Sequence, residues 1–208
     1  AWNNTQWGNR TFYNDLPYIV TNPNEPNRSG MFINSSATTY IESGAIVKVV
    51  MDISIYGSLN TVGDQYPTYF TSIKDDDTGK ELHPEWFDNS GICKPHYPCD
   101  TNNDGTATSP AAGDWIRLRY IASDANSPGA GLLDNCIIRY GGYQNTGNIS
   151  FEQHNSFGKL SPTIKNSIIE NSLYSGIFYS TSTPTLENMI IRNNGNAAIF
   201  TNSLVNTH

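Results

Sequence analysis

The residues most suggestive of chemistry are a run of oxygen-bearing side chains from Asp100 to Thr106, with the sequence Asp-Thr-Asn-Asn-Asp-Gly-Thr. Asp100, Asn102 and Asp104 occupy the first, third and fifth positions, where a calcium-binding loop places side-chain ligands. Gly105 at the sixth position permits a sharp turn, and the main-chain carbonyl of Thr106 at the seventh supplies another oxygen. The spacing therefore predicts a calcium site.

The twelfth position of such a loop usually carries a bidentate glutamate, but here it is an alanine. Another carboxylate must complete the site. We expect it to come from the acidic run that includes Asp76 and Asp77, with Asp75 and Asp114 as further candidates. The alternative interpretation of the same residues is an Asx-rich turn that binds no metal.

The predicted site lies in a segment, residues 74–113, where hydrophobic alternation disappears and acidic residues, Gly and Pro predominate. Loops of this length in a compact domain are usually functional. We call residues 74–113 the long loop, and we expect calcium to pin it to the body of the protein.

Two of the three cysteines, Cys93 and Cys99, lie in a short segment of the long loop that contains two prolines. This spacing predicts a local disulfide, which indicates an oxidising compartment. Zinc held by Cys93, His96 and Cys99 is the alternative, although the segment shows no obvious fourth ligand. Cys136 lies in an apolar run and is expected to be a buried thiol.

An internal repeat determines the fold prediction. Residues 161–171 align without a gap with residues 183–193, and both Pro162–Pro184 and Asn166–Asn188 are 22 residues apart. A third copy covers residues 132–140. Each copy is followed by a second short apolar stretch, at residues 148–151, 176–179 and 198–201. A period near 22 without a helical pattern is typical of a solenoid that stacks parallel strands.

Alternation along these strands assigns their two faces. One inward stack contains Ile138, Ile169 and Ile191, and a second contains Cys136, Ser167 and Met189. The asparagines at one bend are expected to form an internal amide ladder (Asn135, Asn166 and Asn188). Outward residues of alternating charge would stack favourably (Arg139, Glu170 and Arg192). The sequence thus predicts an all-β, right-handed parallel β-helix with a long calcium-pinned loop.

We expect one domain over residues 1–208, with an N-terminal cap region at residues 1–30 that holds Trp2 and Trp7. Residues 31–72 read as further short strands. The chain ends at residues 206–208 in the middle of a coil without a polar capping element, so that end is expected to be uncapped or truncated.

Two outward apolar rows suggest a covered surface. One contains Ile137, Ile168 and Ile190, and the other contains Phe178 and Phe200. We expect a partner there: a neighbouring copy or domain, or else a polysaccharide stacking on the rings. The alternative is that the segment around residues 143–157 folds over these rows.

The net charge of −7 and the 12 Lys and Arg residues argue against nucleic acid as a partner. No apolar run is long enough for membrane insertion. Together with the expected disulfide, these features favour a secreted protein, extracellular or at the cell surface.

Several segments resemble a known group, and they follow its order over nearly the whole chain: residues 17–20, 41–48, 56–60, 70–75, 100–105, 113–115 and 136–142. They are similar to the right-handed β-helix repeat domains of large exported bacterial surface proteins, which are related in fold to pectate lyases. The resemblance implies the fold, whereas such modules serve many functions. Residues 80–99 look like an insertion relative to the group.

We therefore expect a non-catalytic structural or adhesive module that calcium stabilises, and we assign no catalytic residue. One alternative is a polysaccharide lyase, in which calcium acidifies a uronate and a nearby cation removes a proton. Arg117, Arg119 and Lys94 are the cations near the long loop. Another alternative is a carbohydrate-binding module that uses Trp86, Tyr97 and the outward phenylalanines.

Overall fold

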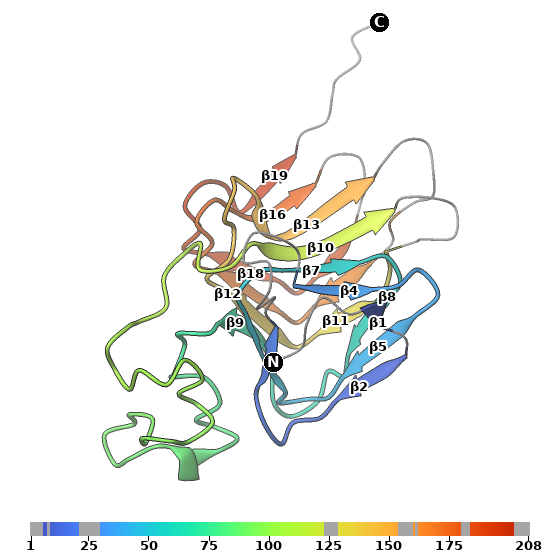
Figure 1. Ribbon diagram of the computed structural model, residues 1–208. Helices are drawn as coiled ribbons and strands as arrows, with labels where there is room; N and C mark the ends of the chain where they lie inside the picture. Colours follow the sequence, from blue (N-terminus) through green and yellow to red (C-terminus); the bar gives the residue numbers. More distant parts are fainter. Residues whose placement is uncertain are drawn as a thin grey trace, which may run out of the picture.

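The structure is a computed structural model that describes residues 6–7, 9–20, 30–122, 129–153, 160, 162–179 and 184–201. Over these residues the chain is all-β apart from one 3-10 helix, η1 (Pro84–Trp86). Every third strand belongs to the same face of a stack, so three strands form one coil (Figure 1). The chain is therefore a parallel β-helix, as its repeat predicts.

The three faces consist of the following strands. The first face contains β1 (Gln6–Trp7), β4 (Met31–Ile33), β7 (Asp52–Ile55), β10 (Arg117–Ala122), β13 (Gly147–Gln153), β16 (Ser175–Tyr179) and β19 (Ile199–Thr201). The second face contains one sheet of β2 (Arg10–Phe12), β5 (Thr38–Ile41) and β8 (Ser58–Thr61), and another of β11 (Leu132–Asp134), β14 (Thr163–Lys165) and β17 (Thr185–Glu187). The third face contains β3 (Tyr18–Val20), β6 (Ile46–Val49), β9 (Thr68–Ser72), β12 (Cys136–Arg139), β15 (Ile168–Glu170) and β18 (Ile190–Arg192).

The core consists of aliphatic and aromatic side chains that stack from coil to coil. On the third face Ile138 pairs with Phe70 and Ile169, and all three side chains are buried. On the first face the rings of Tyr120 and Phe151 stack with centroids 5.4 Å apart. These stacks remove apolar surface from water through the described coils before the last one, which is the main stabilising contribution.

Asparagines form the corner between the second and third faces. Asn135, Asn166 and Asn188 have φ angles of 54°, 51° and 49°, a left-handed conformation that asparagine tolerates better than most residues. Asn188 donates a 2.8 Å hydrogen bond to Asn166, which donates to Asp134. The ladder therefore exists, but it lies at the surface and its third member is Asp134, because the amide of Asn135 bonds to the carbonyl of Asp64.

The predicted outward charges also align. Arg139 pairs with Glu170 in register, and Glu170 pairs with Arg192. The side chain of Glu170 lies 2.8 Å from Arg192 and 3.8 Å from Arg139. This alternation of sign confirms the strand register predicted from the repeat.

The described part of residues 1–30, where we expected a cap, contributes strands to the stack itself. β1, β2 and β3 pair in parallel with β4, β5 and β6. Trp2 lies outside the described residues, as does the end of the chain at residues 202–208.

The long loop projects from the corner where β9 of the third face leads to β10 of the first face (green in Figure 1). Its two ends are joined at the base, because Asp114 accepts 2.7 Å hydrogen bonds from both Ser72 and Lys74. Thr101 also donates to the carbonyl of Ile73. The loop is thus fastened to the helix and has a defined position relative to β6 and β9.

Candidate metal centre

Three aspartates from two distant parts of the long loop meet at one point. Asp76, Asp100 and Asp104 each place a carboxylate oxygen within 4.8 Å of the others. Asp76 follows the end of β9, whereas Asp100 and Asp104 belong to the loop with the calcium-type spacing. The structure therefore assembles a group of oxygens suited to a metal ion.

The main chain turns sharply between Asp100 and Gly105. Asp100 accepts hydrogen bonds from the amides of Asp104 and Gly105, at 3.1 and 3.0 Å. Asn103 and Gly105 adopt left-handed φ angles of 57° and 68°, which produce the turn. A left-handed conformation is inexpensive for both residue types.

Oδ1 of Asp76, of Asn102 and of Asp104 is buried and accepts no hydrogen bond, although Oδ1 of Asp76 lies 3.7 Å from the ammonium of Lys48. Two neighbouring polar atoms are satisfied, since Nδ2 of Asn102 donates to Oδ2 of Asp104 at 2.7 Å and Thr108 donates to that oxygen as well. A buried oxygen without a partner costs free energy. Coordination of a cation would remove this cost.

Burial and repulsion between like charges both change the pKa of Asp76. Burial raises the pKa of its carboxyl group to about 6, the nearby Lys48 opposes this rise, and the charges of Asp100 and Asp104 add to it. Crowded carboxylates with a raised pKa are an arrangement that a divalent cation relieves.

The remaining acidic candidates have other partners. Asp75 is buried and pairs with Arg139 at 2.8 Å, while Asp77 is exposed and pairs with Lys80 at 2.6 Å. Asp114 joins the base of the loop. Of these candidates, Asp76 alone belongs to the aspartate triad found among the described residues.

Thr106 lines a cavity of about 230 Å³ beside Asp76, together with Lys74, Asp77 and Thr108. This cavity leaves room for water molecules or a ligand next to the triad. Calcium takes six to eight oxygen ligands, so such room suits a site that lacks the usual glutamate.

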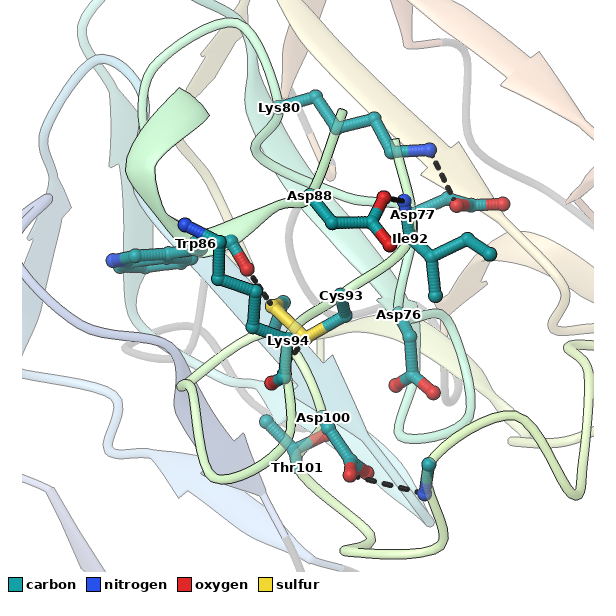
Figure 2. The surroundings of a disulfide bond; sticks show 12 residues. Asp76, Asp77, Lys80, Trp86, Asp88, Ile92, Cys93, Lys94, Asp100 and Thr101 are labelled. Carbon is teal, nitrogen blue, oxygen red and sulfur yellow. Dashed lines mark hydrogen bonds and ion pairs between the residues drawn. A yellow bond between two sulfur atoms is a disulfide. The ribbon is translucent and has the colours of Figure 1, made fainter. Parts of the chain in front are cut away.

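The disulfide predicted from the sequence joins Cys93 and Cys99, with their Cα atoms 5.9 Å apart. Both sulfurs are therefore occupied, which excludes the zinc interpretation. Figure 2 shows the disulfide close to Asp76 and Asp100. Because Cys99 directly precedes Asp100, the disulfide restricts the segment that leads into the candidate site. Cys136 is a buried free thiol, as expected.

The long loop packs on the third face through a small second hydrophobic core. Trp86, Phe87 and Cys99 of the loop are buried against Ile46 of β6, and Tyr69 of β9 packs at its edge. Ile46 and Tyr69 pair in register, and Tyr69 pairs in turn with Ile137. The loop therefore covers the beginning of the outward apolar row whose later members were predicted from the sequence.

The later members of that row continue beyond the loop. Ile137, Ile168 and Ile190 pair in register, with Ile190 52% exposed. On the first face Phe178 and Phe200 stack with ring centroids 5.7 Å apart. Part of the segment around residues 143–157 lies outside the described residues.

The cations considered for proton abstraction are engaged elsewhere. Arg117 and Arg119 both pair with Glu152 on the first face, at 2.7 Å for Arg117. Lys94 donates to the carbonyl of Glu85. Each of these cations is thus held by a protein group.

Sequence reasoning missed one residue beside the triad, Lys48 of β6. Its side chain is fully buried, and its ammonium lies 3.7 Å from Oδ1 of Asp76. Burial lowers the pKa of Lys48 to about 8, although the neighbouring aspartates favour its charged form. A lone lysine in an apolar strand is a weak signal, because such residues more often reach solvent.

No protein-family model matches this chain, and the comparisons with curated proteins and with solved structures give no match either. Within the described residues, no helix is long and apolar enough to cross a membrane. The disulfide is typical of proteins from an oxidising environment such as the extracellular space.

Proposed function

We propose that this chain is a structural or adhesive β-helix module of an extracellular surface protein or assembly, and that calcium stabilises it. The observation that carries the proposal is the meeting of the carboxylates of Asp76, Asp100 and Asp104 within 4.8 Å of one another, where Oδ1 of Asp76 and Oδ1 of Asp104 are buried and accept no hydrogen bond. The ion would bind these oxygens and hold the long loop against the third face.

The chemistry of the ligands favours calcium. All the side-chain donors are hard oxygens, carboxylate or amide, which suit calcium or magnesium better than softer metals. The loop combines Asx ligands at alternate positions with a carboxylate from a distant segment, and calcium accepts such irregular geometry more readily than magnesium does.

The proposed compartment fits the expected affinity. The site lacks the bidentate glutamate of the tightest calcium loops, and weak calcium sites of extracellular modules are saturated only at high calcium concentrations. A secreted protein would meet the high calcium concentration that a weak site needs, and the oxidising conditions in which the disulfide beside the site forms.

The surface beyond the long loop supports the adhesive part of the proposal. The apolar row continues past the loop through Ile137 and Ile168 to the exposed Ile190. A second copy or a neighbouring domain could pack on this row as the loop packs on Ile46 and Tyr69. Size-exclusion chromatography with light scattering, comparing the wild type with Ile190→Ser, tests this contact. Loss of an assembly in the variant supports it, and a monomeric wild type contradicts self-association.

Carbohydrate binding is a second candidate function, which the stacked rings of Phe178 and Phe200 favour. Aromatic rings on an open face can stack against sugars, with Tyr174 nearby as a further ring. A glycan array would show binding without turnover. Incubation with a polyuronate and calcium tests the lyase alternative, for which an unsaturated product absorbing in the ultraviolet is diagnostic. We expect no such product.

Calcium titration tests the main proposal. Isothermal titration of chelator-treated protein should show one binding site, and limited proteolysis should cut the long loop faster in chelator than in calcium. The proposal would be abandoned if calcium neither released heat nor altered the cleavage pattern, and if elemental analysis found no bound metal.

A further inference from the structure

Lys48 occupies an unusual position for a cation. It lies on β6 between Val47 and Val49, which belong to the main core, and it pairs in register with Thr71 of β9. Because side chains alternate along a strand, Lys48 points away from that core and toward the long loop. It is nevertheless completely buried, since the loop covers it.

The ammonium group of Lys48 joins two segments of the long loop that are distant in sequence. It donates hydrogen bonds to the main-chain carbonyl of Asp75 at 2.8 Å and to that of Cys99 at 2.7 Å. Each acceptor directly precedes a candidate ligand, Asp76 in one segment and Asp100 in the other. One side chain thus fixes the main chain next to both ligands.

We propose that Lys48 is a positioning residue of the metal centre, which brings Asp76 and Asp100 together before the ion binds. This inference rests on the proposed function. A buried ammonium needs hydrogen-bond acceptors, so it has a strong preference for the arrangement in which both carbonyls meet it. Ordering the ligands in advance lowers the free energy that the ion must otherwise supply.

Two physical effects of Lys48 on calcium binding have opposite signs, which makes the proposal testable. As a positive charge near Asp76, Lys48 repels a calcium ion, and its removal would strengthen binding through electrostatics alone. As a bridge between two carbonyls, it orders the ligands, and its removal would weaken binding. We expect the second effect to dominate, because both hydrogen bonds are short and buried.

The test is the calcium affinity of Lys48→Met, in which an uncharged side chain of similar length fills the same space. We expect binding about 10- to 100-fold weaker than in the wild type, the range seen when residues that orient ligands are replaced. The matched control is Lys80→Met, which removes a cation of the long loop that pairs with the exposed side chain of Asp77. The control should bind calcium close to the wild-type affinity.

The outcomes separate the two proposals. If the wild type binds calcium and Lys48→Met binds it equally or more tightly, the positioning role is overturned and the calcium site stands. If the wild type binds no calcium, the proposed function fails, and the positioning role fails with it. Circular dichroism of each variant establishes that it has folded.

A second measurement needs no variant. Hydrogen–deuterium exchange of the wild type in chelator should show slow exchange at the amides of Asp75, Asp100 and Thr101, which donate to main-chain carbonyls, because the bridge orders these segments without metal. Fast exchange there in chelator, followed by protection only when calcium is added, would overturn the positioning role even if Lys48→Met does not fold.

Discussion

The side-chain amide of Asn188 donates a 2.8 Å hydrogen bond to Oδ1 of Asn166, its counterpart one coil earlier in the stack. Both residues adopt a left-handed conformation at the same corner of the helix. The bond therefore serves two purposes: it satisfies polar groups at the bend, and it links consecutive coils at equivalent positions. The two asparagines are 22 residues apart, which is the length of one coil.

The conformation of Asn166 gives the first prediction. Asn166→Ala should lower the free energy of unfolding by about 2 kcal/mol, because alanine resists the left-handed conformation and both side-chain hydrogen bonds are lost. Asn166→Gly should cost only about 1 kcal/mol, since glycine accepts this conformation. Urea denaturation measures both values. Equal losses in the two variants would contradict the conformational explanation.

The second prediction distinguishes the ligands within the acidic run. Asp104→Asn should weaken calcium binding about 10-fold or more, because it removes a negative charge from a carboxylate in the triad. Asp77→Asn removes the same charge from an exposed residue paired with Lys80, and it should change the affinity far less. Isothermal titration provides both affinities. A larger effect at Asp77 than at Asp104 would place the metal elsewhere.

Cys136 provides a prediction about pH. Burial raises the pKa of its thiol to about 12, above the value near 8.5 expected in an unfolded chain. The folded state thus keeps a proton that the unfolded state loses, so the contribution of the neutral thiol to stability is complete below about pH 8.5 and declines as the pH rises toward 12. The stability difference between the wild type and Cys136→Ala should shrink by about 1.4 kcal/mol per pH unit across this window.

Urea denaturation of both proteins at several alkaline pH values measures that difference. The pKa of the buried Tyr120 is also raised, by burial and by the neighbouring Cys136, so the comparison is made below pH 10, where tyrosine stays protonated even in an unfolded chain. A difference that stays constant with pH would show that the thiol of Cys136 is not held neutral by burial.

The fold could be predicted because its signal is repeated in the sequence. The 22-residue separation of Asn166 and Asn188 gave the length of one coil. The alternating charges of Arg139, Glu170 and Arg192 confirmed the strand register independently. Each coil repeats the same local environment, so every copy adds evidence for one arrangement. The surface position of the asparagine ladder was missed, because the direction of a side chain at a bend depends on the local φ angle rather than on alternation.

The candidate site could be predicted only in part. The spacing of Asp100, Asn102 and Asp104 is a local pattern, whereas the third carboxylate, that of Asp76, depends on how the long loop docks. Three consecutive aspartates look alike in sequence, yet Asp75 meets Arg139 and only Asp76 reaches the triad. The role of Lys48 could not be predicted from the sequence, because its ammonium bonds to main-chain carbonyls. Every residue has such a carbonyl, so no residue type marks the acceptors.

The most direct test of the account is a crystal structure of the protein grown in calcium, with long-wavelength anomalous data. We predict one anomalous peak 2.3–2.6 Å from carboxylate oxygens of Asp76, Asp100 and Asp104, the usual calcium–oxygen distance, with Asn102 and the carbonyl of Thr106 as further ligands. A map that shows only water among these three carboxylates at saturating calcium, or a peak bound elsewhere, would contradict the claim that calcium holds the long loop in place.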